Sequence, residues 1–401
     1  MIIDWTSLPI SVGGGLLGEW LEIHDVVRFD TACVGHDNRT TFLQYCSATT
    51  YSCEITVMSS SQMNWIAQRG FRLVDINFFQ LDWSDSREWR PTLDALKKLL
   101  SANGTKTKRI KMGCMESAVP APEVLAIISR YCQNLLHIEV SFDVGDPAAA
   151  VLFSSLRRIE SIALSDSDIT NASFRFLENN CTELRELYLC RLPLKDDALL
   201  AIFRSCPNLR VLDISTCGMI GHKGVIAMLR SCPLLEEVNL SQMPAAVAAA
   251  AAKVLAAEEH CALPLRALTI DKLSTTELRA IVAKYSLLSQ LRVTDCIGWA
   301  DWSCCLRGFT ALSLCRLPSL TLTEARQLVS SNPQLTDLSL TVKARVSTAA
   351  VLCLLDGLPA LQTLSVRTAD SSRQEASTAQ VLEVMVRRIY PSLQRVTICL
   401  L

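Results

Sequence analysis

Histidines are the first residues to consider for acid–base or nucleophilic chemistry, because imidazole titrates near neutral pH. The chain has five of them among 401 residues, at His24, His36, His137, His222 and His260. They show no association with a serine or cysteine that would place a nucleophile beside its base. The sequence therefore predicts a protein without catalytic residues, and not an enzyme.

Two pairs of aspartates resemble the paired carboxylates of an acid–base site. They are Asp166 and Asp168, in SDSDIT, and Asp196 and Asp197. Both pairs lie where a helix is expected to begin, where a carboxylate can cap free N–H groups and interact favourably with the helix dipole. Helix capping explains these aspartates better than catalysis does.

Cysteine is the third residue type that could do chemistry, and the chain has 17. No C-x-x-C pair occurs, and the adjacent Cys304 and Cys305 lack a second cysteine cluster or neighbouring histidines for zinc. One position of a repeated phrase is shared by Cys132, Cys181, Cys206 and Cys232. This regularity predicts buried packing thiols in a reducing compartment, the cytoplasm or the nucleus, with no metal and no cofactor.

The repeated phrase has the nine-residue pattern C-x-x-L-x-x-L-x-L. It reads CTELRELYL at 181–189, CPNLRVLDI at 206–214 and CPLLEEVNL at 232–240. The repeat is therefore about 25 residues long, which is typical of leucine-rich repeats. Weaker copies bring the phrases from residue 132 onward to eleven, and two fainter ones begin at residues 70 and 107.

Each repeat predicts a short strand followed by a helix. Leu209, Leu212 and Ile214 mark a short strand with one buried face, because successive side chains of a strand point to opposite faces. Val225, Ile226 and Leu229 then recur at helical spacing. Stacked units of this kind predict an α/β fold, a leucine-rich-repeat solenoid with a curved parallel β-sheet and outer helices.

Composition limits the classes of partner. Half of the residues are hydrophobic and the formal net charge is −1, so we expect a globular intracellular protein. The one basic run, KTKRIK at 106–111, is better explained as a solvated strand edge than as a nucleic-acid site. No apolar stretch is long enough to span a membrane, and no signal peptide is expected.

The N-terminal segment carries a loose second motif: Leu8-Pro9, Leu17, Trp20-Leu21, Asp25-Val26 and Ala32-Cys33. This pattern resembles the F-box, a small helical module that holds the Skp-type adaptor of cullin ubiquitin ligases. F-box proteins commonly carry cysteine-containing leucine-rich repeats, which DISTCGMIGHKGVIAMLRSCPLL at 213–235 also resembles. The resemblance implies an adaptor-binding site at Leu8, Pro9, Leu17 and Leu21.

A second interpretation of this segment stays open. Glycines occupy 13–15, where the F-box has its first helix, and glycine costs about 1 kcal/mol per helical position. The segment could then be a cap that covers the first repeat without binding an adaptor. In either case we expect residues 1–48 to form the F-box-like part, 49–131 a transitional region with faint repeats, and 132–401 the solenoid.

Binding is expected on the concave sheet, where the non-leucine positions of successive strands line up. Those positions predict an acidic stripe of Glu139, Glu186, Asp213 and Glu237 around Tyr188, with basic residues only later, and Asn239 and Arg292 complete the predicted partner-binding set. Such a stripe would suit a basic protein segment. The alternative is a set of solvated charges without any partner, because exposed strand faces are ordinarily polar.

The sequence thus predicts a non-enzymatic protein-recognition module. One hypothesis is the substrate receptor of a Skp-cullin-F-box ubiquitin ligase. The other is a structural or assembly scaffold that binds protein partners through its concave face and has no ubiquitin role.

Overall fold

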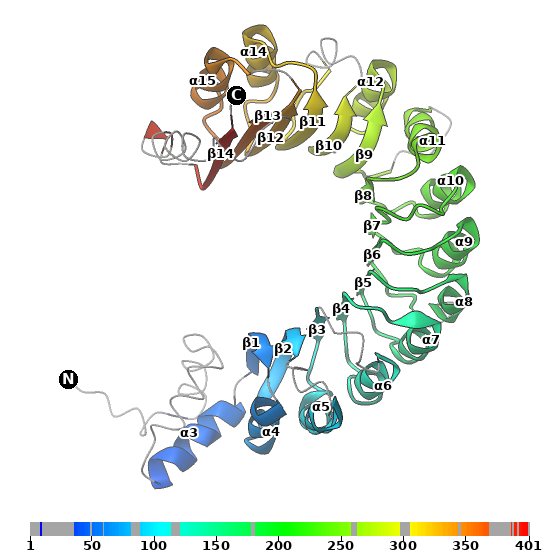
Figure 1. The fold of residues 1–401 in the computed structure, drawn as a ribbon, viewed down its shortest axis with the longest axis vertical. Coiled ribbons are helices and arrows are strands. Elements are labelled where there is room, and N and C mark those ends of the chain that lie inside the picture. Colours follow the sequence, from blue (N-terminus) through cyan, green and yellow to red (C-terminus); the bar gives the residue numbers. More distant parts are fainter. Residues whose placement is uncertain are drawn as a thin grey trace, which may run out of the picture. The chain divides into compact units, whose positions relative to one another are not determined.

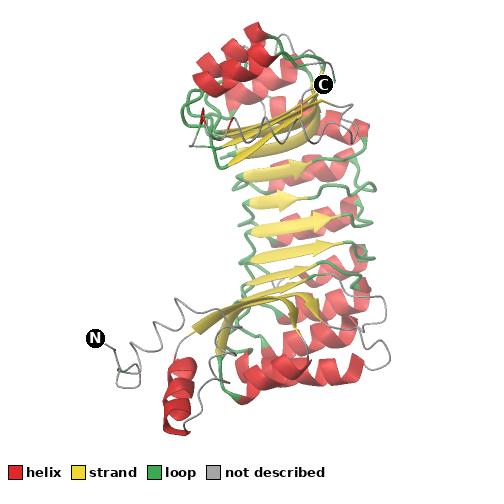
Figure 2. Ribbon diagram, turned by 60° about the vertical axis from the view of Figure 1, so that its left-hand side comes forward, coloured by secondary structure: helices red, strands yellow, loops and turns green. Residues whose placement is uncertain are grey.

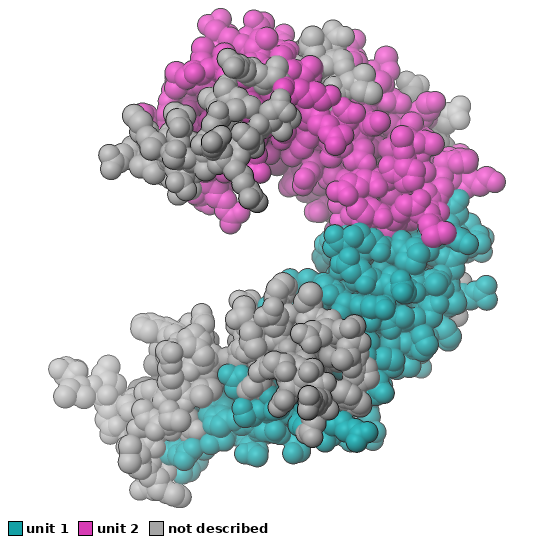
Figure 3. Space-filling view, viewed as in Figure 1, with its two compact units in different colours: residues 1–209 teal, residues 210–401 magenta. Residues whose placement is uncertain are grey.

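A computed structural model describes most of the chain. The described residues are 9, 36–48, 50–58, 60–81, 89–113, 121–177, 181–257, 263–296, 305–343, 346–368, 386, 389–390 and 393–399. The chain divides into two compact units, residues 1–209 (unit 1) and 210–401 (unit 2), which are coloured separately in Figure 3. Within each unit the strands are parallel and neighbouring strands pair in chain order, so each repeat lies beside the next.

Unit 1 is built from strand–helix repeats. Its described strands are β1 (Thr50–Met58), β2 (Arg72–Leu81), β3 (Arg109–Met112), β4 (His137–Val140), β5 (Ser161–Ser165) and β6 (Glu186–Cys190). Its described helices are α3 (His36–Ala48), α4 (Ser60–Gln68), α5 (Trp89–Asn103), α6 (Ala121–Tyr131), α7 (Gly145–Ser155), α8 (Asn171–Phe174), the 3₁₀ helix η2 (Arg175–Leu177) and α9 (Asp196–Ser205). Of the helices that the structure describes, α4 to α9 lie along one face of the sheet and none covers the other, which we call the open face (Figure 1).

Unit 2 continues the same pattern. Its described strands are β7 (Val211–Asp213), β8 (Glu237–Leu240), β9 (Ala267–Leu273), β10 (Gln290–Cys296), β11 (Ala311–Leu317), β12 (Asp337–Val342), β13 (Thr363–Thr368) and β14 (Arg395–Cys399). Its described helices are α10 (His222–Ser231), α11 (Ala245–Ala256), α12 (Thr275–Lys284), α14 (Leu322–Ser331) and α15 (Thr348–Gly357). None of these described helices lies on the opposite face of the sheet (Figure 2).

The core lies between strands and helices because the leucine-type positions of each phrase point inward. Leu187 and Leu189 of β6 are fully buried, as are Leu199 and Ile202 of α9. The intervening strand positions, Glu186 and Tyr188, are only half buried. This alternation follows from the two-residue period of a strand, and it confirms the predicted α/β leucine-rich-repeat solenoid.

The phrase cysteines sit where each helix ends. Cys206 is the C-terminal cap of α9, and its Sγ lies 3.6 Å from the carbonyl oxygen of Cys181, in the preceding repeat. Cys132, Cys181, Cys206 and Cys232 are all fully buried. In α14 the capping position is held by Asn332, which is equally buried. The predicted packing role of these cysteines is confirmed.

All eleven phrases from residue 132 onward contain a strand, from β4 to β14. The two fainter copies, at residues 70 and 107, contain β2 and β3. The strand β1 was not predicted, because TYSCEITVM lacks the leucine spacing of the phrase. Before it, α3 contacts β2 and buries Phe42, Tyr45 and Cys46.

Candidate protein-binding face

The open face of unit 1 is organised in rows by the strand register. Arg109, His137, Ser161 and Glu186 pair in one row across β3 to β6. Lys111, Glu139, Ala163 and Tyr188 pair in the next row. Parallel strands lie about 4.8 Å apart, so neighbours in a row are within reach of one another's side chains. The predicted residues Glu139, Glu186 and Tyr188 therefore belong to one continuous surface.

This surface contains a hollow of about 630 Å³, which is lined by residues of β3 to β6. The small side chains of Ser161 and Ala163 line the hollow at β5, and larger residues line it on the neighbouring strands, His137 and Glu139 on β4 and Glu186 and Tyr188 on β6. We call this the unit 1 hollow. Small residues between larger ones leave room for a side chain of a partner.

The charges of this face are mixed, which corrects the expectation that basic residues appear only later. Lys111 Nζ lies 2.8 Å from Glu139 Oε2. Arg109 Nη1 lies 3.9 Å from Asp75 Oδ2, at the edge of ion-pair range. The basic segment 106–111 was interpreted as a solvated edge, whereas its strand β3 pairs with both β2 and β4.

Glu186 differs from the other carboxylates of this face. It is half buried and makes no ion pair or hydrogen bond through its side chain with any residue in the described ranges. Its neighbour on the same face of β6 is Tyr188. An unpaired carboxylate beside an aromatic ring can receive a cationic side chain through charge and through the ring face.

Unit 2 holds the remaining predicted residues, and two of them are engaged internally. Asp213 Oδ2 accepts a hydrogen bond of 2.7 Å from Asn239 Nδ2, and its Oδ1 accepts one of 2.8 Å from the Ser215 N–H. Asn239 Oδ1 in turn accepts from the N–H and hydroxyl of Ser241. Asp213 and Asn239 therefore join β7 to β8, while Glu237 and Arg292 are exposed.

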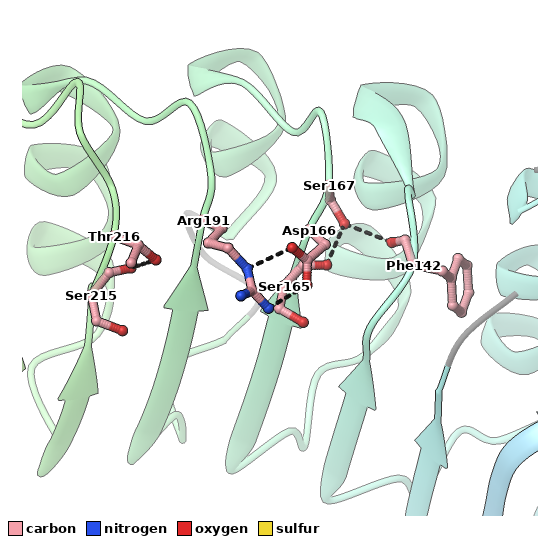
Figure 4. A network of polar contacts seen from close by, with 7 residues as sticks. All are labelled: Phe142, Ser165, Asp166, Ser167, Arg191, Ser215 and Thr216. Carbon is pink, nitrogen blue, oxygen red and sulfur yellow. Dashed lines mark hydrogen bonds and ion pairs between the residues drawn. The ribbon is translucent and has the colours of Figure 1, made fainter. Parts of the chain in front are cut away.

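The helix-cap explanation is wrong for Asp166. This residue has a left-handed backbone with φ 56° and lies before Thr170, the N-cap of α8. Its carboxylate pairs with Arg191, with Oδ1 2.5 Å from Nε and Oδ2 2.7 Å from Nη2 (Figure 4). Arg191 follows β6 and is also left-handed.

The capping explanation is also wrong for Asp168, because the N-cap of α8 is Thr170. For the other two aspartates only the dipole part of the explanation is confirmed, because the N-cap of α9 is Lys195. Asp196 and Asp197 lie in the first turn of α9, where the helix dipole favours them, as predicted. Asp168 donates its N–H to Asp143 Oδ1 at 3.1 Å, in the loop that follows β5. Neighbouring Ser167 donates to the carbonyl of Phe142 at 2.7 Å (Figure 4). These groups tie one loop to the loop of the preceding repeat.

The buried thiols are unsuited to nucleophilic chemistry. Burial raises the pKa of Cys132 and Cys206 to about 12, and burial with the neighbouring Cys206 does the same for Cys181. A thiol is reactive as the thiolate, which these groups do not form near neutral pH. Within the described ranges, no three histidine, cysteine or acidic side chains gather as a metal site would require.

The F-box-like residues are mostly outside the described part of the chain. Leu8, Leu17 and Leu21 lie there, and Pro9 is described as an exposed residue without regular secondary structure. Among the helices that the structure does describe, none has the length and apolar character needed to cross a membrane.

Comparisons with known proteins add two likenesses. No model of a known protein family matches the chain. F-box/LRR-repeat protein 4 of Bos taurus is 25% identical over 173 residues, which is 42% of this chain and 27% of that protein. The chain thus matches about a quarter of that relative's length. A chain of the yeast Rad7 and Elc1 complex covers 87% of this chain, with 96% of its own length aligned, 14% identity and a TM-score of 0.47.

Proposed function

We propose that this chain is a non-enzymatic protein receptor, and that its open face in unit 1 binds a basic segment of a partner protein. The observation that carries the proposal is the unit 1 hollow, where the unpaired carboxylate of Glu186 lies beside Tyr188 above small residues. Glu139 attracts a basic partner less strongly than its charge implies, because Lys111 already pairs with it.

The extent of this face favours a protein over a small molecule. The two rows cross four strands, a distance of about 14 Å at the usual strand spacing. The hollow lies open on the sheet and its lining residues come from β3 to β6 and the residue after β4. Charges distributed over such a surface select a partner by complementary charge and register. A basic segment would place one cationic side chain at Glu186.

The proposal extends to a ubiquitin ligase. The F-box-like motif and the relative named F-box/LRR-repeat protein 4 both support a receptor that holds a Skp-type adaptor through Leu8, Pro9, Leu17 and Leu21. The unit 1 face would then bind the substrate, in the cytoplasm or nucleus, and the transfer chemistry would belong to the partners. A scaffold that binds proteins on the same face without an adaptor is the competing function.

Adaptor capture separates these two functions. The purified full chain and a variant with alanine at Leu8, Pro9, Leu17 and Leu21 are each mixed with an extract that contains the Skp-type adaptor and cullin. We expect the wild type to capture both proteins and the folded variant to capture neither. Absence of capture by the wild type would reject the ligase function and leave the scaffold function.

Substrate binding is tested at Glu186. We expect Glu186→Lys to lose a set of captured proteins that the wild type retains, as measured by quantitative mass spectrometry. Glu183→Lys is the matched control, because Glu183 is an exposed glutamate in the turn before β6 and not on the open face. Equal loss in both variants, or loss in neither, would reject the unit 1 face as the binding surface.

A further inference from the structure

A second hollow, of about 250 Å³, lies on the open face of unit 2. Its lining comes from β9 to β13, and we call it the unit 2 hollow. Arg292 of β10 is the one cationic side chain among its described lining residues, and it is exposed. Ala267 of β9 and Ala311 of β11 flank the same strand at the neighbouring position, Gln290. These small side chains leave space beside the guanidinium.

Hydroxyl groups flank Arg292 on both sides. Thr269 of β9 and Ser313 of β11 are its direct partners in the strand register. Both are half buried, and neither hydroxyl makes a hydrogen bond with a residue that the structure describes. Elsewhere on this face polar neighbours satisfy one another, as Thr294 does by donating to Asp271 Oδ1 at 2.6 Å. The groups around Arg292 are instead available to a ligand.

Among the described lining residues Asp337 is the one acid, and it is too distant to neutralise Arg292. Asp337 lies on β12, where it pairs with Ala311 of β11, so the whole of β11 lies between Asp337 and β10. Two strand spacings amount to about 10 Å, which is beyond an ion pair. Asp337 Oδ2 instead accepts a hydrogen bond of 2.7 Å from the Thr336 hydroxyl. Within the described residues, the Arg292 guanidinium has no ion-pair partner.

We propose that the unit 2 hollow binds the carboxylate of an aspartate or glutamate side chain from a partner protein. A guanidinium donates two parallel N–H bonds to a carboxylate, and the Thr269 and Ser313 hydroxyls supply neutral donors on either side. One positive charge balances one carboxylate, whereas a phosphoryl group carries close to two negative charges. The site rests on the proposed function, because its ligand belongs to a bound protein.

Peptide selection tests this assignment. A phage library of random 16-residue peptides is selected on the full chain, on Arg292→Glu, on Arg326→Glu and on Glu186→Lys. Arg326 is the matched control, since it is exposed on the outer helix α14. We expect peptides enriched on the wild type and on Arg326→Glu to share an acidic position, and Arg292→Glu to lose them. Replacing that acid by lysine should restore binding to Arg292→Glu.

Affinities measured by fluorescence polarisation complete the test. We expect Arg292→Glu to weaken binding at least tenfold and Ser313→Ala to weaken it several-fold. Peptides without a shared acid, equal binding by Arg292→Glu, or no enrichment on the wild type would overturn the site. A phosphoserine at the acidic position that binds more than tenfold tighter would reassign it to a phosphoryl group. Loss of capture in Glu186→Lys, with Arg292→Glu unaffected, would preserve the proposed function and reject this site alone.

Discussion

Lys111 and Glu139 form an ion pair across β3 and β4, with 2.8 Å between Nζ and Oε2. Both side chains remain about 40% exposed, so the pair is solvated and contributes less than about 1 kcal/mol to stability. Its larger effect is on recognition, because it places a positive charge next to a carboxylate that would otherwise attract a basic partner. The unit 1 face is thus less acidic than its glutamates alone suggest.

Removing Lys111 should therefore strengthen binding of a cation while barely changing the fold. For Lys111→Met we expect the free energy of unfolding to fall by less than about 1 kcal/mol. We expect the affinity for a fluorescent oligolysine peptide to rise several-fold at low salt, and less at high salt. Lys98→Met, on the exposed side of α5, is the control. An affinity unchanged at low salt would contradict the role given to the pair.

Asn332 should be among the most sensitive polar residues of unit 2. It is fully buried, accepts the Phe309 N–H at 2.9 Å and donates to the Leu306 carbonyl at 2.9 Å. Replacing it by leucine leaves both backbone groups unsatisfied, at roughly 1–3 kcal/mol each. We expect Asn332→Leu to lower the urea midpoint strongly, and Gln334→Leu, in the exposed turn that follows, to leave it nearly unchanged.

Gly104 should not tolerate a methyl group. A Cβ there would lie 2.5 Å from the carbonyl oxygen of Tyr131 and 2.6 Å from that of Leu100. Both obstacles are backbone atoms, which cannot rotate away, so we expect Gly104→Ala to cost more than about 2 kcal/mol as overpacking does in a core. Gly218→Ala is the control, because nothing lies within 4 Å of its Cβ position. Equal melting temperatures for the two variants would be the contrary result.

Gln242 offers a stabilising substitution. It follows β8 with φ 58°, and its side chain is exposed. A left-handed conformation costs a residue with a Cβ about 1–2 kcal/mol, and glycine avoids this cost. Glycine also loses more chain entropy on folding, which reduces the gain by about 0.5–1 kcal/mol. We expect Gln242→Gly to raise the free energy of unfolding by up to about 1 kcal/mol. Gln334→Gly, at an exposed position without a positive φ, should lower it.

The buried thiols predict how stability depends on pH. Burial raises their pKa from the ordinary thiol value of 9.0 to about 12 in the folded chain. Above pH 9 the unfolded chain releases these protons and the folded chain keeps them, so stability falls as pH rises toward 12. Each thiol contributes a slope of about 1.4 kcal/mol per pH unit. Their contribution is fully present below pH 9.

Denaturant titrations between pH 8 and pH 11 measure this slope. Cys206→Ala should flatten the decline, because one buried ionising group is removed. A decline as steep in Cys206→Ala as in the wild type would show that other groups cause the dependence.

The repeat phrase was sufficient to predict the strands because its apolar positions are the buried ones. Leu209 and Leu212 are buried as their spacing implies. The interaction partner of a polar residue could not be predicted in this way, because it depends on the register between strands that lie far apart in sequence. The Lys111–Glu139 pair follows only once β3 is known to align with β4 residue by residue.

Backbone conformation escaped prediction for a related reason. Asp166 has a left-handed φ. A glycine at this position would have indicated that conformation. An aspartate does not, because aspartates are also common before helices. Of the four acids in the predicted stripe, Glu139 and Glu186 lie in unit 1, and Asp213 and Glu237 lie in unit 2. Its role in binding stays a prediction, as do the domain boundaries at residues 48 and 131.

The in-register pairing of the strands makes the open face of each unit a coordinate grid. One axis counts repeats, in steps of about 4.8 Å, and the other counts alternate residues along a strand, in steps of about 6.6 Å. Adding or removing a whole repeat would change the length of the grid, while the side chains of the other repeats kept their positions relative to their neighbours. Inserting one residue within a strand would instead send that strand's outward side chains into the core. Whole repeats are therefore the units by which such a surface can be lengthened or shortened while the strand register is kept.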